Sequence, residues 1–389
     1  MPAADLEVLL SRLVSIDSVN PDLVPGARGE TDIAAFVAQW LREQGLEVRL
    51  QDTGHAGRPN VIATVHGSAG HGRGGKCVLL NAHMDTVGVA GMSSPFQPEV
   101  RDGKLYARGA LDTKGALAAF MCAAVDVLRL PLHGDVVLTA VADEEYASAG
   151  TEAVVRELSG DRLRADAAIV GEPTGLKIVT EHKGFVWLEI ETAGVAAHGS
   201  LPAAGVDAIA AMGDVLVGLQ LESERLARTP PHHSLGPGSI HASLISGGQE
   251  LSSYPASCLL RLERRTVPGE TPETVERELG AVLQRIRDAR PDFRATLRRT
   301  FHRNPMEADR GSPVAAALAS SVARVTGAPA GFAGMSGWLD SALLDGAGIP
   351  TAVIGPAGEG LHGVQEWVSL ESVRACREIV RGALEELCA

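Results

Sequence analysis

Short, continuous apolar runs recur in the first and last parts of the chain, and segments with helical spacing separate them. Residues 30–44, 313–326 and 370–387 are predicted helices, and residues 114–128 form a helix that is apolar on nearly every side. Buried parallel strands have uninterrupted apolar sequences, and strands that alternate with helices build layered α/β domains. The pattern therefore predicts an α/β domain with a mostly parallel central sheet. The apolar runs are residues 78–80, 136–141, 167–170 and 351–354.

The pattern changes in the middle of the chain, where strand-like segments alternate apolar and polar side chains. The predicted order is strand, helix, strand, strand, helix, strand, which is the ferredoxin-like β-α-β-β-α-β arrangement. We therefore expect a separate small domain at residues 182–301, inserted into a larger domain made of residues 1–181 and 302–389. The segments are strand 185–192, helix 205–221, strands 239–245 and 257–265, helix 271–289 and strand 293–299.

Length, charge and cysteine content narrow the possible classes of protein. A chain of 389 residues is too long for one typical core. The formal charge of -13 argues against nucleic acid or an anionic membrane as the main partner. The five cysteines include no C-x-x-C pair, which indicates a reducing compartment without a thiolate metal site. Residues 1–16 predict an amphipathic helix and not a signal peptide, so we expect a cytoplasmic protein.

Two further segments exclude other functions. Residues 116–125 are apolar but too short to span a bilayer. Residues 67–75 are rich in glycine, yet their spacing fits no phosphate-binding loop and predicts a flexible turn.

Acidic and histidine side chains follow the apolar runs, near the points where the predicted strands end. Functional groups gather at the carboxyl ends of strands in an open parallel sheet, so we expect these side chains to converge. Carboxylates and imidazoles that converge from distant parts of a chain are what a two-metal site requires. The side chains are His83, Asp85, Asp112, Glu144, Glu145, Glu172 and His362.

Five motifs in this order resemble those of a known family. They are His83-Met84-Asp85, Arg108-Gly109-Ala110-Leu111-Asp112-Thr113-Lys114-Gly115, Asp143-Glu144-Glu145, Gly171-Glu172-Pro173-Thr174 and His362-Gly363-Val364-Gln365-Glu366. The chain resembles the di-zinc metallohydrolases that include acetylornithine deacetylase, succinyl-diaminopimelate desuccinylase, aminoacylase and glutamate carboxypeptidase. The resemblance covers nearly the whole chain and implies that the inserted segment serves as a lid and dimerisation domain.

The resemblance also implies a role for each matching residue. Asp112 would bridge two divalent ions, which we expect to be zinc, with cobalt or manganese as substitutes. His83 and Glu172 would complete one metal site, and Glu145 and His362 the other. Imidazole and carboxylate groups are common zinc ligands, and one carboxylate can bridge two ions that lie about 3.5–4 Å apart.

Two further carboxylates would assist the metal ligands. Asp85 would orient the imidazole of His83. Glu144 would act as the general base that takes a proton from water and delivers it to the leaving amine.

Residues of the inserted segment are candidates for substrate contact. Arg265 matches the family's D-x-R motif before a Pro-Gly turn, with Glu263 in place of the aspartate, and strand alternation places Arg264 on the opposite face. An arginine fork binds a carboxylate in bidentate fashion, so we expect a small-molecule substrate with a free carboxylate. The resemblance implies that His198 reaches the active site of the other subunit in a homodimer and stabilises the oxyanion.

His241 and a turn around residue 336 are two further candidates for contact with the substrate or its oxyanion. His241 stands where many relatives carry asparagine. Ser336 and Gly337 lie in a turn whose backbone N–H groups could bind a carboxylate.

Three functions remain open at this point. The favoured one is hydrolysis of the amide bond of an N-acyl amino acid, because in relatives a glutamate at position 172 accompanies deacylases and carboxypeptidases. A dipeptidase or a glutamate-type carboxypeptidase on the same scaffold is the alternative. A non-catalytic binding protein is more remote, because a pure binder has no need of a free base such as Glu144 beside the ligands.

Overall fold

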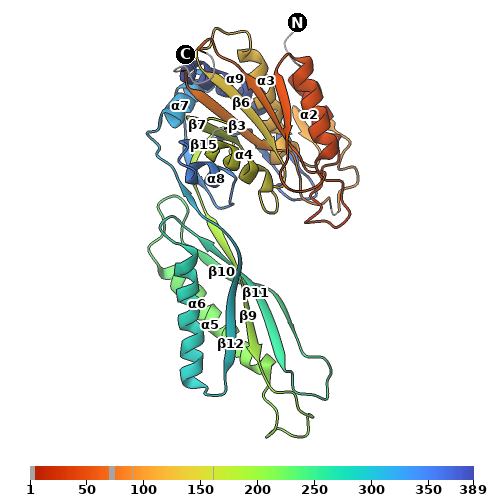
Figure 1. Ribbon diagram of the computed structural model, residues 1–389, viewed down its shortest axis with the longest axis vertical. Helices are drawn as coiled ribbons and strands as arrows, with labels where there is room; N and C mark the ends of the chain where they lie inside the picture. The colour runs from red at the N-terminus through yellow and green to blue at the C-terminus, as the bar shows by residue number, and fades with distance from the viewer. Residues whose placement is uncertain (1–4, 70–74, 90, 161) are drawn as a thin grey trace. The chain divides into compact units, whose positions relative to one another are not determined.

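The computed structural model describes residues 5–69, 75–89, 91–160 and 162–389 (Figure 1). Residues 1–4 of the predicted N-terminal helix and residues 70–74 of the predicted glycine-rich turn lie outside these ranges. The chain forms two compact units. The first consists of Met1–Thr180, Ala308–Ala333 and Leu339–Ala389, and the second of Glu181–Glu307 and Gly334–Trp338. The second unit thus contains all of the expected insertion, residues 182–301, together with a few residues on either side and a short later segment.

A nine-stranded sheet forms the core of the α/β layer. Its centre is parallel, since β3 pairs in parallel with β6 and β7, and β7 with β15. Antiparallel pairs flank this centre, which confirms a mostly parallel central sheet. The strand order is β1 (Glu47–Gln51), β2 (Asn60–Val65), β6 (Asp135–Val141), β3 (Cys77–His83), β7 (Ala167–Gly171), β15 (Thr351–Ile354), β8 (Ile178–His182) and β13 (Met306–Glu307), with β14 (Phe332–Met335) paired to β8.

Helices cover both faces of the central strands. Five of them share one buried apolar cluster with side chains of β3, β6 and β7. The opposite face carries α4 (Ala149–Ser159), where Asn81 of β3 donates a hydrogen bond of 3.1 Å to Thr151 Oγ1. The five helices of the cluster are α1 (Leu6–Val14), α2 (Thr31–Glu43), α3 (Gly115–Val127), α7 (Pro313–Thr326) and α9 (Leu370–Leu387).

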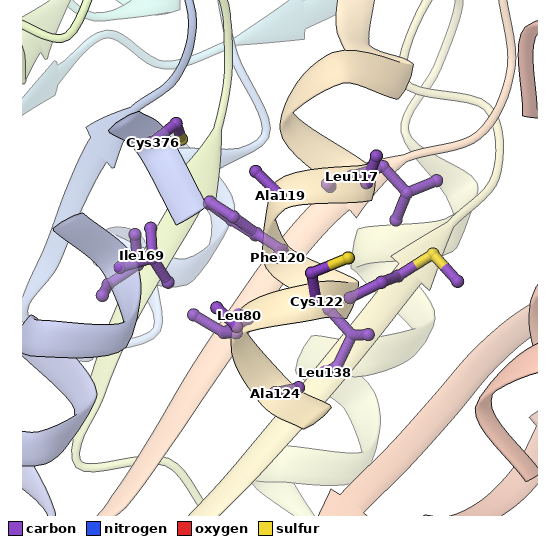
Figure 2. Packing of buried hydrophobic residues seen from close by; sticks show 14 of the residues in the cluster. Leu80, Leu117, Ala119, Phe120, Cys122, Ala124, Leu138, Ile169 and Cys376 are labelled. Atoms are coloured by element: carbon purple, nitrogen blue, oxygen red, sulfur yellow. The ribbon is translucent and has the colours of Figure 1, made fainter. Parts of the chain in front are cut away.

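Helix α3 is the most deeply buried of these helices, as its apolar sequence predicts. Phe120 of α3 lies among side chains of the sheet, including Leu80 and Ile169, and Cys376 of α9 lies in the same cluster (Figure 2). A π-helical turn, η1 (Ala110–Lys114), leads directly into α3 and carries Asp112. In the described ranges, no helix combines the length and apolar composition needed to cross a bilayer.

A small sheet and a short helix complete the first unit. The sheet has the order β16 (Gly358–Glu359), β17 (Trp367–Ser369), β5 (Lys104–Tyr106) and β4 (Glu99–Arg101). Helix α8 (Ser341–Gly346) precedes β15. These elements are too short to produce a recognisable hydrophobic period, and the sequence analysis did not predict them.

The second unit has the predicted ferredoxin-like order. Its elements are β9 (Gly184–Ala193), α5 (Ala208–Arg228), β10 (Ser239–Gly247), β11 (Ser257–Thr266), α6 (Pro272–Ala289) and β12 (Arg294–Arg303). The strands form an antiparallel sheet in the order β10, β11, β9, β12, and both helices pack against one face of it. Helix α5 extends beyond the predicted end at residue 221, because Leu226 continues its buried face.

Candidate active site

The carboxyl ends of four adjacent strands bring most of the predicted metal ligands together. Strands β6, β3, β7 and β15 are parallel neighbours, so their carboxyl ends lie at one edge of the sheet. His83 is the last residue of β3, Glu172 follows β7 directly, and Glu144 and Glu145 follow β6 in a short turn. His362 lies in the loop that follows β15 and β16.

The carboxylate of Asp112 lies between two imidazoles. Its Oδ1 is 3.2 Å from Nε2 of His83, and its Oδ2 is 3.2 Å from Nε2 of His362. Nε2 of His362 is also 3.3 Å from Oε2 of Glu145. On the other side, Nε2 of His83 is 3.9 Å from Oε1 of Glu172 and 4.0 Å from Oε2 of Glu144.

These residues form two groups that could each hold a metal ion. One group contains His83, Asp112 and Glu145, and the other contains His83, Glu144 and Glu172. Within each group the ligand atoms lie within 4.8 Å of one another. The imidazole and carboxylate donors are those that zinc prefers, so the residues present fit two divalent ions.

The charges of the cluster also fit bound cations. Burial, followed by repulsion from neighbouring carboxylates, raises the pKa of Glu144 well above its usual value. Burial and the charge of Asp112 raise the pKa of Glu145 to about 7. Oε1 of Glu145 is buried and has no hydrogen-bond partner among the described residues. A cation would neutralise this crowded negative charge and occupy the unpartnered oxygen.

The pKa values of the two histidines are raised as well, which favours their positively charged form. Although burial disfavours the protonated imidazole of His83, hydrogen bonds to Asp112 and Asp85 raise its pKa well above the usual value. Hydrogen bonds to Asp112 and Glu145 raise the pKa of His362 to about 10. Protons and metal cations compete for the same donors, so metal binding would release protons from these imidazoles.

Asp85 connects the histidine of one strand end to the carboxylate turn of the next. The side chain is fully buried, and its Oδ1 lies 3.5 Å from Nδ1 of His83. The same carboxylate accepts hydrogen bonds from the backbone N–H groups of Glu144, at 3.1 Å, and Glu145, at 3.2 Å. Asp85 therefore orients both the imidazole and the turn that carries the two glutamates.

A buried polar network holds Asp85 in place, and the sequence did not predict it. Nδ2 of Asn20 donates to Oδ2 of Asp85 at 2.8 Å and to Oδ1 of Asp143 at 3.0 Å. The buried guanidinium of Arg58 forms ion pairs with Glu30 at 2.7 Å and with Asp143 at 2.9 Å. No local signal in the sequence marks Asn20 or Arg58, because their partners lie far away in the chain.

Glu366 holds the turn that carries Asp112. Its carboxylate accepts backbone N–H bonds from Gly109 at 3.0 Å, Leu111 at 2.9 Å and Asp112 at 3.1 Å. Arg108 pairs with the same carboxylate at 2.6 Å. Glu366 and Arg108 lie inside motifs quoted in the sequence analysis, which assigned no role to either residue.

A further buried carboxylate lies near the metal-binding groups. Oδ2 of Asp340 accepts a hydrogen bond of 2.6 Å from Thr151 Oγ1, and burial raises the pKa of Asp340 to about 6. No pattern in the sequence marks Asp340 as part of the site.

The two arginines on β11 have different environments, as strand alternation predicts. The Arg264 side chain is 1% exposed and pairs with Glu270 at 2.5 Å. The Arg265 side chain is 33% exposed, and its Nε lies 2.7 Å from Oε1 of Glu263. The Arg265 guanidinium also lies 5.3 Å from the centre of the Phe185 ring. Of the two arginines, only Arg265 has a guanidinium that is accessible to a ligand.

The other predicted substrate contacts also lie in the second unit. His198 is exposed in the segment between β9 and α5, and its Nδ1 lies 2.8 Å from Ser200 Oγ. His241 is exposed on β10. Ser336 and Gly337 are exposed between β14 and α8.

Comparison with known proteins identifies the family. The model of a family described as Peptidase family M20/M25/M40 matches residues 79–386. The chain belongs to this peptidase family. It is 30% identical over 400 residues to acetylornithine deacetylase from Myxococcus xanthus, a match that covers 98% of this chain and 97% of that protein.

Solved structures of the M20 family share the fold. An M20 metallo-carboxypeptidase from Sulfolobus solfataricus matches with a TM-score of 0.78 and 17% identity, over 98% of this chain and 99% of that one. A dinuclear metal-binding M20 peptidase from Bacillus subtilis matches with a TM-score of 0.74 and 18% identity, over 98% and 97% of the two chains. This M20 protein is therefore a metallohydrolase that acts on amide bonds.

Proposed function

We propose that this M20 enzyme hydrolyses the amide bond of an N-acyl amino acid, as an acetylornithine deacetylase does. The observation that carries the proposal is the Asp112 carboxylate, whose two oxygens face two different histidines at 3.2 Å each. A carboxylate in this position is suited to bridge two ions. The relative from Myxococcus xanthus, which matches nearly end to end, favours a deacylase within the family.

His83 and Glu172 would hold one divalent ion, and Glu145 and His362 the other, with Asp112 between them. We propose zinc, because the donors are imidazole nitrogens and carboxylate oxygens without thiolates. When bound, the ions would polarise the amide carbonyl and lower the pKa of a coordinated water. Cobalt and manganese prefer overlapping donor sets and should substitute.

Glu144 is the proposed general base. Its buried carboxyl group has a raised pKa, and although it is close enough to join the group of His83 and Glu172, we leave that ion to His83, Glu172 and Asp112 and assign proton transfer to Glu144. It would remove a proton from the attacking water, whose oxygen bonds to the carbonyl carbon. The C–N bond then breaks, and the same proton passes from Glu144 to the nitrogen of the leaving amine. Asp85 would hold the imidazole of His83 and the turn that carries Glu144 in place during both steps.

The second unit supplies the proposed substrate contacts. Arg265 is the accessible guanidinium of its pair and would bind a free carboxylate on the substrate. His241, Ser336 and Gly337 would add hydrogen-bond donors, and His198 would stabilise the oxyanion.

We further propose a homodimer that pairs through the second unit. Strand β10 lies at the edge of its sheet, and Leu244 and Ile245 on it are 61% and 55% exposed. On α5, Val217 and Leu221 are 60% and 59% exposed. An unpaired edge strand next to exposed apolar side chains favours association with a second copy. His198 would then serve the active site of the partner subunit.

A substrate panel tests the proposed reaction. Purified enzyme with added zinc or cobalt is assayed on N-acetyl, N-succinyl and N-carbamoyl amino acids and on dipeptides. We expect the largest kcat/KM for an N-acyl amino acid. Higher kcat/KM for dipeptides would instead support the alternative, a dipeptidase or glutamate-type carboxypeptidase.

A further inference from the structure

A second group of metal-binding side chains lies in the second unit. Glu181 on β8 and Glu307 on β13 are directly paired residues of an antiparallel ladder. His232 and His233 belong to the segment between α5 and β10. Glu181, His232 and His233 each offer one ligand atom, and these atoms all lie within 4.8 Å of one another.

The paired glutamates place two like charges side by side. Like charges that are directly opposite on neighbouring strands destabilise a sheet, and Glu181 is almost fully buried. The two histidines supply the nearest partners in this group. Nε2 of His233 lies 3.2 Å from Oε1 of Glu181, and Nε2 of His232 lies 3.5 Å from Oε1 of Glu307.

The histidines are held in place and not merely close. The backbone N–H and C=O of His232 both pair with Gly236, at 3.1 Å each, which closes a tight turn. The ring centres of His232 and His233 are 4.4 Å apart. Ser234 donates a hydrogen bond from Oγ to Glu181, and its Oγ lies 3.4 Å from Nδ1 of His232. The turn thus presents two imidazoles to the carboxylates in a defined geometry.

Two features suit a bound cation better than ion pairs alone. Nε2 of His232 is buried and lacks a hydrogen-bond partner in the described part of the chain. The carboxylates of Glu181 and Glu307 approach these rings from directly paired positions on two strands, so one divalent ion could offset both negative charges.

We propose that Glu181, His232 and His233 bind a divalent transition-metal ion, and that the nearby Glu307 carboxylate adds favourable negative charge. Zinc fits best, because it accepts imidazole and carboxylate donors in a tetrahedral arrangement. Ligand atoms of a tetrahedral zinc site lie about 3.4 Å apart, from metal–ligand distances of about 2.1 Å. The separation of 3.2 Å between His233 Nε2 and Glu181 Oε1 matches that spacing.

The position of this site gives it a structural role. Glu181 and Glu307 are the first and last residues of the continuous segment that forms most of the second unit. The chain enters this segment through β8 and leaves it through β13. A bound ion would connect these strands to the turn before β10. The ion would therefore stabilise the second unit and is separate from the two proposed catalytic ions.

Zinc content after loading and desalting tests the proposal. The starting protein is the His83→Ala/Asp112→Ala variant, in which the catalytic cluster has lost the bridging carboxylate and one imidazole. His233→Ala is then added, a change at a side chain that is 59% exposed and should not disturb folding. The matched control is His66→Ala, because His66 is 52% exposed and pairs with Glu47 at 3.0 Å.

We expect the double variant and its His66→Ala derivative to retain about one zinc ion per chain, and the His233→Ala derivative to retain none. Zinc should also raise the melting temperature of the double variant but not that of the His233→Ala derivative, because a ligand stabilises only the state that binds it. A double variant that binds no zinc, or equal zinc content with and without His233, would overturn the proposal.

If the double variant does not fold, the wild-type chain gives the same test. His233→Ala should then lower its zinc content by about one ion, whereas His66→Ala should not. Unchanged content in both variants would leave the four side chains as ordinary ion pairs.

Discussion

Glu144 and Glu145 are adjacent in the chain, yet their carboxyl groups have different neighbours. Glu145 reaches His362 at 3.3 Å, whereas Glu144 lies on the side of His83 that faces Glu172. Successive side chains of a tight turn point in different directions, so one can bind metal while the other remains available to transfer a proton. The roles of the two glutamates can therefore be separated by single substitutions.

Glu144→Gln should abolish most turnover and leave metal binding intact. Glutamine has nearly the same shape but cannot accept the proton, and a general base contributes about 10²–10⁴-fold in rate. Steady-state kinetics and elemental analysis measure the two effects. Glu145→Gln serves as the control, because it should lower both metal content and activity. Near wild-type kcat for Glu144→Gln would remove this residue from the mechanism.

Arg264 and Arg265 provide a second contrast between neighbours. Arg265→Ala should weaken transition-state binding of a substrate with a free carboxylate by about 2–5 kcal/mol, which lowers its kcat/KM. The loss should be much smaller for the corresponding primary amide. Arg264→Ala should instead lower the melting temperature, because it leaves Glu270 without its buried partner. Kinetics on acid and amide, together with thermal unfolding, distinguish the two. If Arg264→Ala and not Arg265→Ala changes the acid-to-amide preference, the assignment is wrong.

At the scale of elements, a turn outside the strands sets the position of Asp112, the proposed bridging ligand. Asp112 lies on η1, and three backbone N–H groups of the segment from Gly109 to Asp112 point to the carboxylate of Glu366. Glu366 directly precedes β17, a strand of the small sheet. Glu366 therefore holds the turn that carries Asp112, the carboxylate proposed to bridge the two ions.

Glu366→Gln should weaken metal binding by about 10–100-fold, the usual effect of losing a group that orients a ligand. Glutamine retains one oxygen acceptor but replaces the other with an N–H donor, which faces backbone N–H groups. Competition with a chelator measures the affinity. Glu359→Gln, at an exposed side chain of the same small sheet, is the control and should not change it. Equal affinities for the two variants would contradict the positioning role.

At the scale of the whole molecule, the active-site groups make the stability of the metal-free protein depend on pH. The pKa of Glu145 is raised from 4.5 to about 7. When the pKa of a group is higher in the folded than in the unfolded protein, its protonation stabilises the folded state. This contribution is fully present below the pKa of the unfolded state and disappears as the pH rises through the pKa of the folded state. His362, whose pKa is raised to about 10, has the same sign, and Asp112, whose pKa is lowered, loses its contribution only in acid.

The melting temperature of the metal-free protein should therefore fall as the pH rises from about 5 to about 7.5. Glu145→Gln mimics the protonated carboxyl group and should show a smaller fall. Thermal unfolding after dialysis against a chelator measures both proteins. Identical pH profiles for the two would show that Glu145 does not hold a raised pKa.

Assembly is the other property of the whole molecule that can be tested. If His198 serves the partner's active site, mixing the inactive His198→Ala and Glu144→Gln chains should restore activity in heterodimers. Each heterodimer then contains one site with an intact Glu144 and an intact His198 from the other chain. Subunit exchange is followed with two affinity tags. Heterodimers without recovered activity would favour a site built from one chain.

The sequence by itself predicted the layered α/β domain, the ferredoxin-like order and the convergence of the metal-binding residues. These features depend on local patterns: buried strands have continuous apolar sequences, and the residues that follow them lie at one edge of a parallel sheet. Strand alternation also separated Arg264 from Arg265. The short elements β4, β5, β13, β14, β16 and β17 have too few residues to show a period and emerged only in the structure.

Only the tertiary structure decided which polar residues support the ligands. Asn20 reaches Asp85, Glu366 reaches η1, and Glu181 meets both Glu307 and the turn at His233. These partners are separated by tens to hundreds of residues in the chain. In the sequence alone, such an asparagine or glutamate cannot be distinguished from an exposed polar residue. Hydrogen bonds and metal ligation depend on distance in space, and that distance is set when the chain folds.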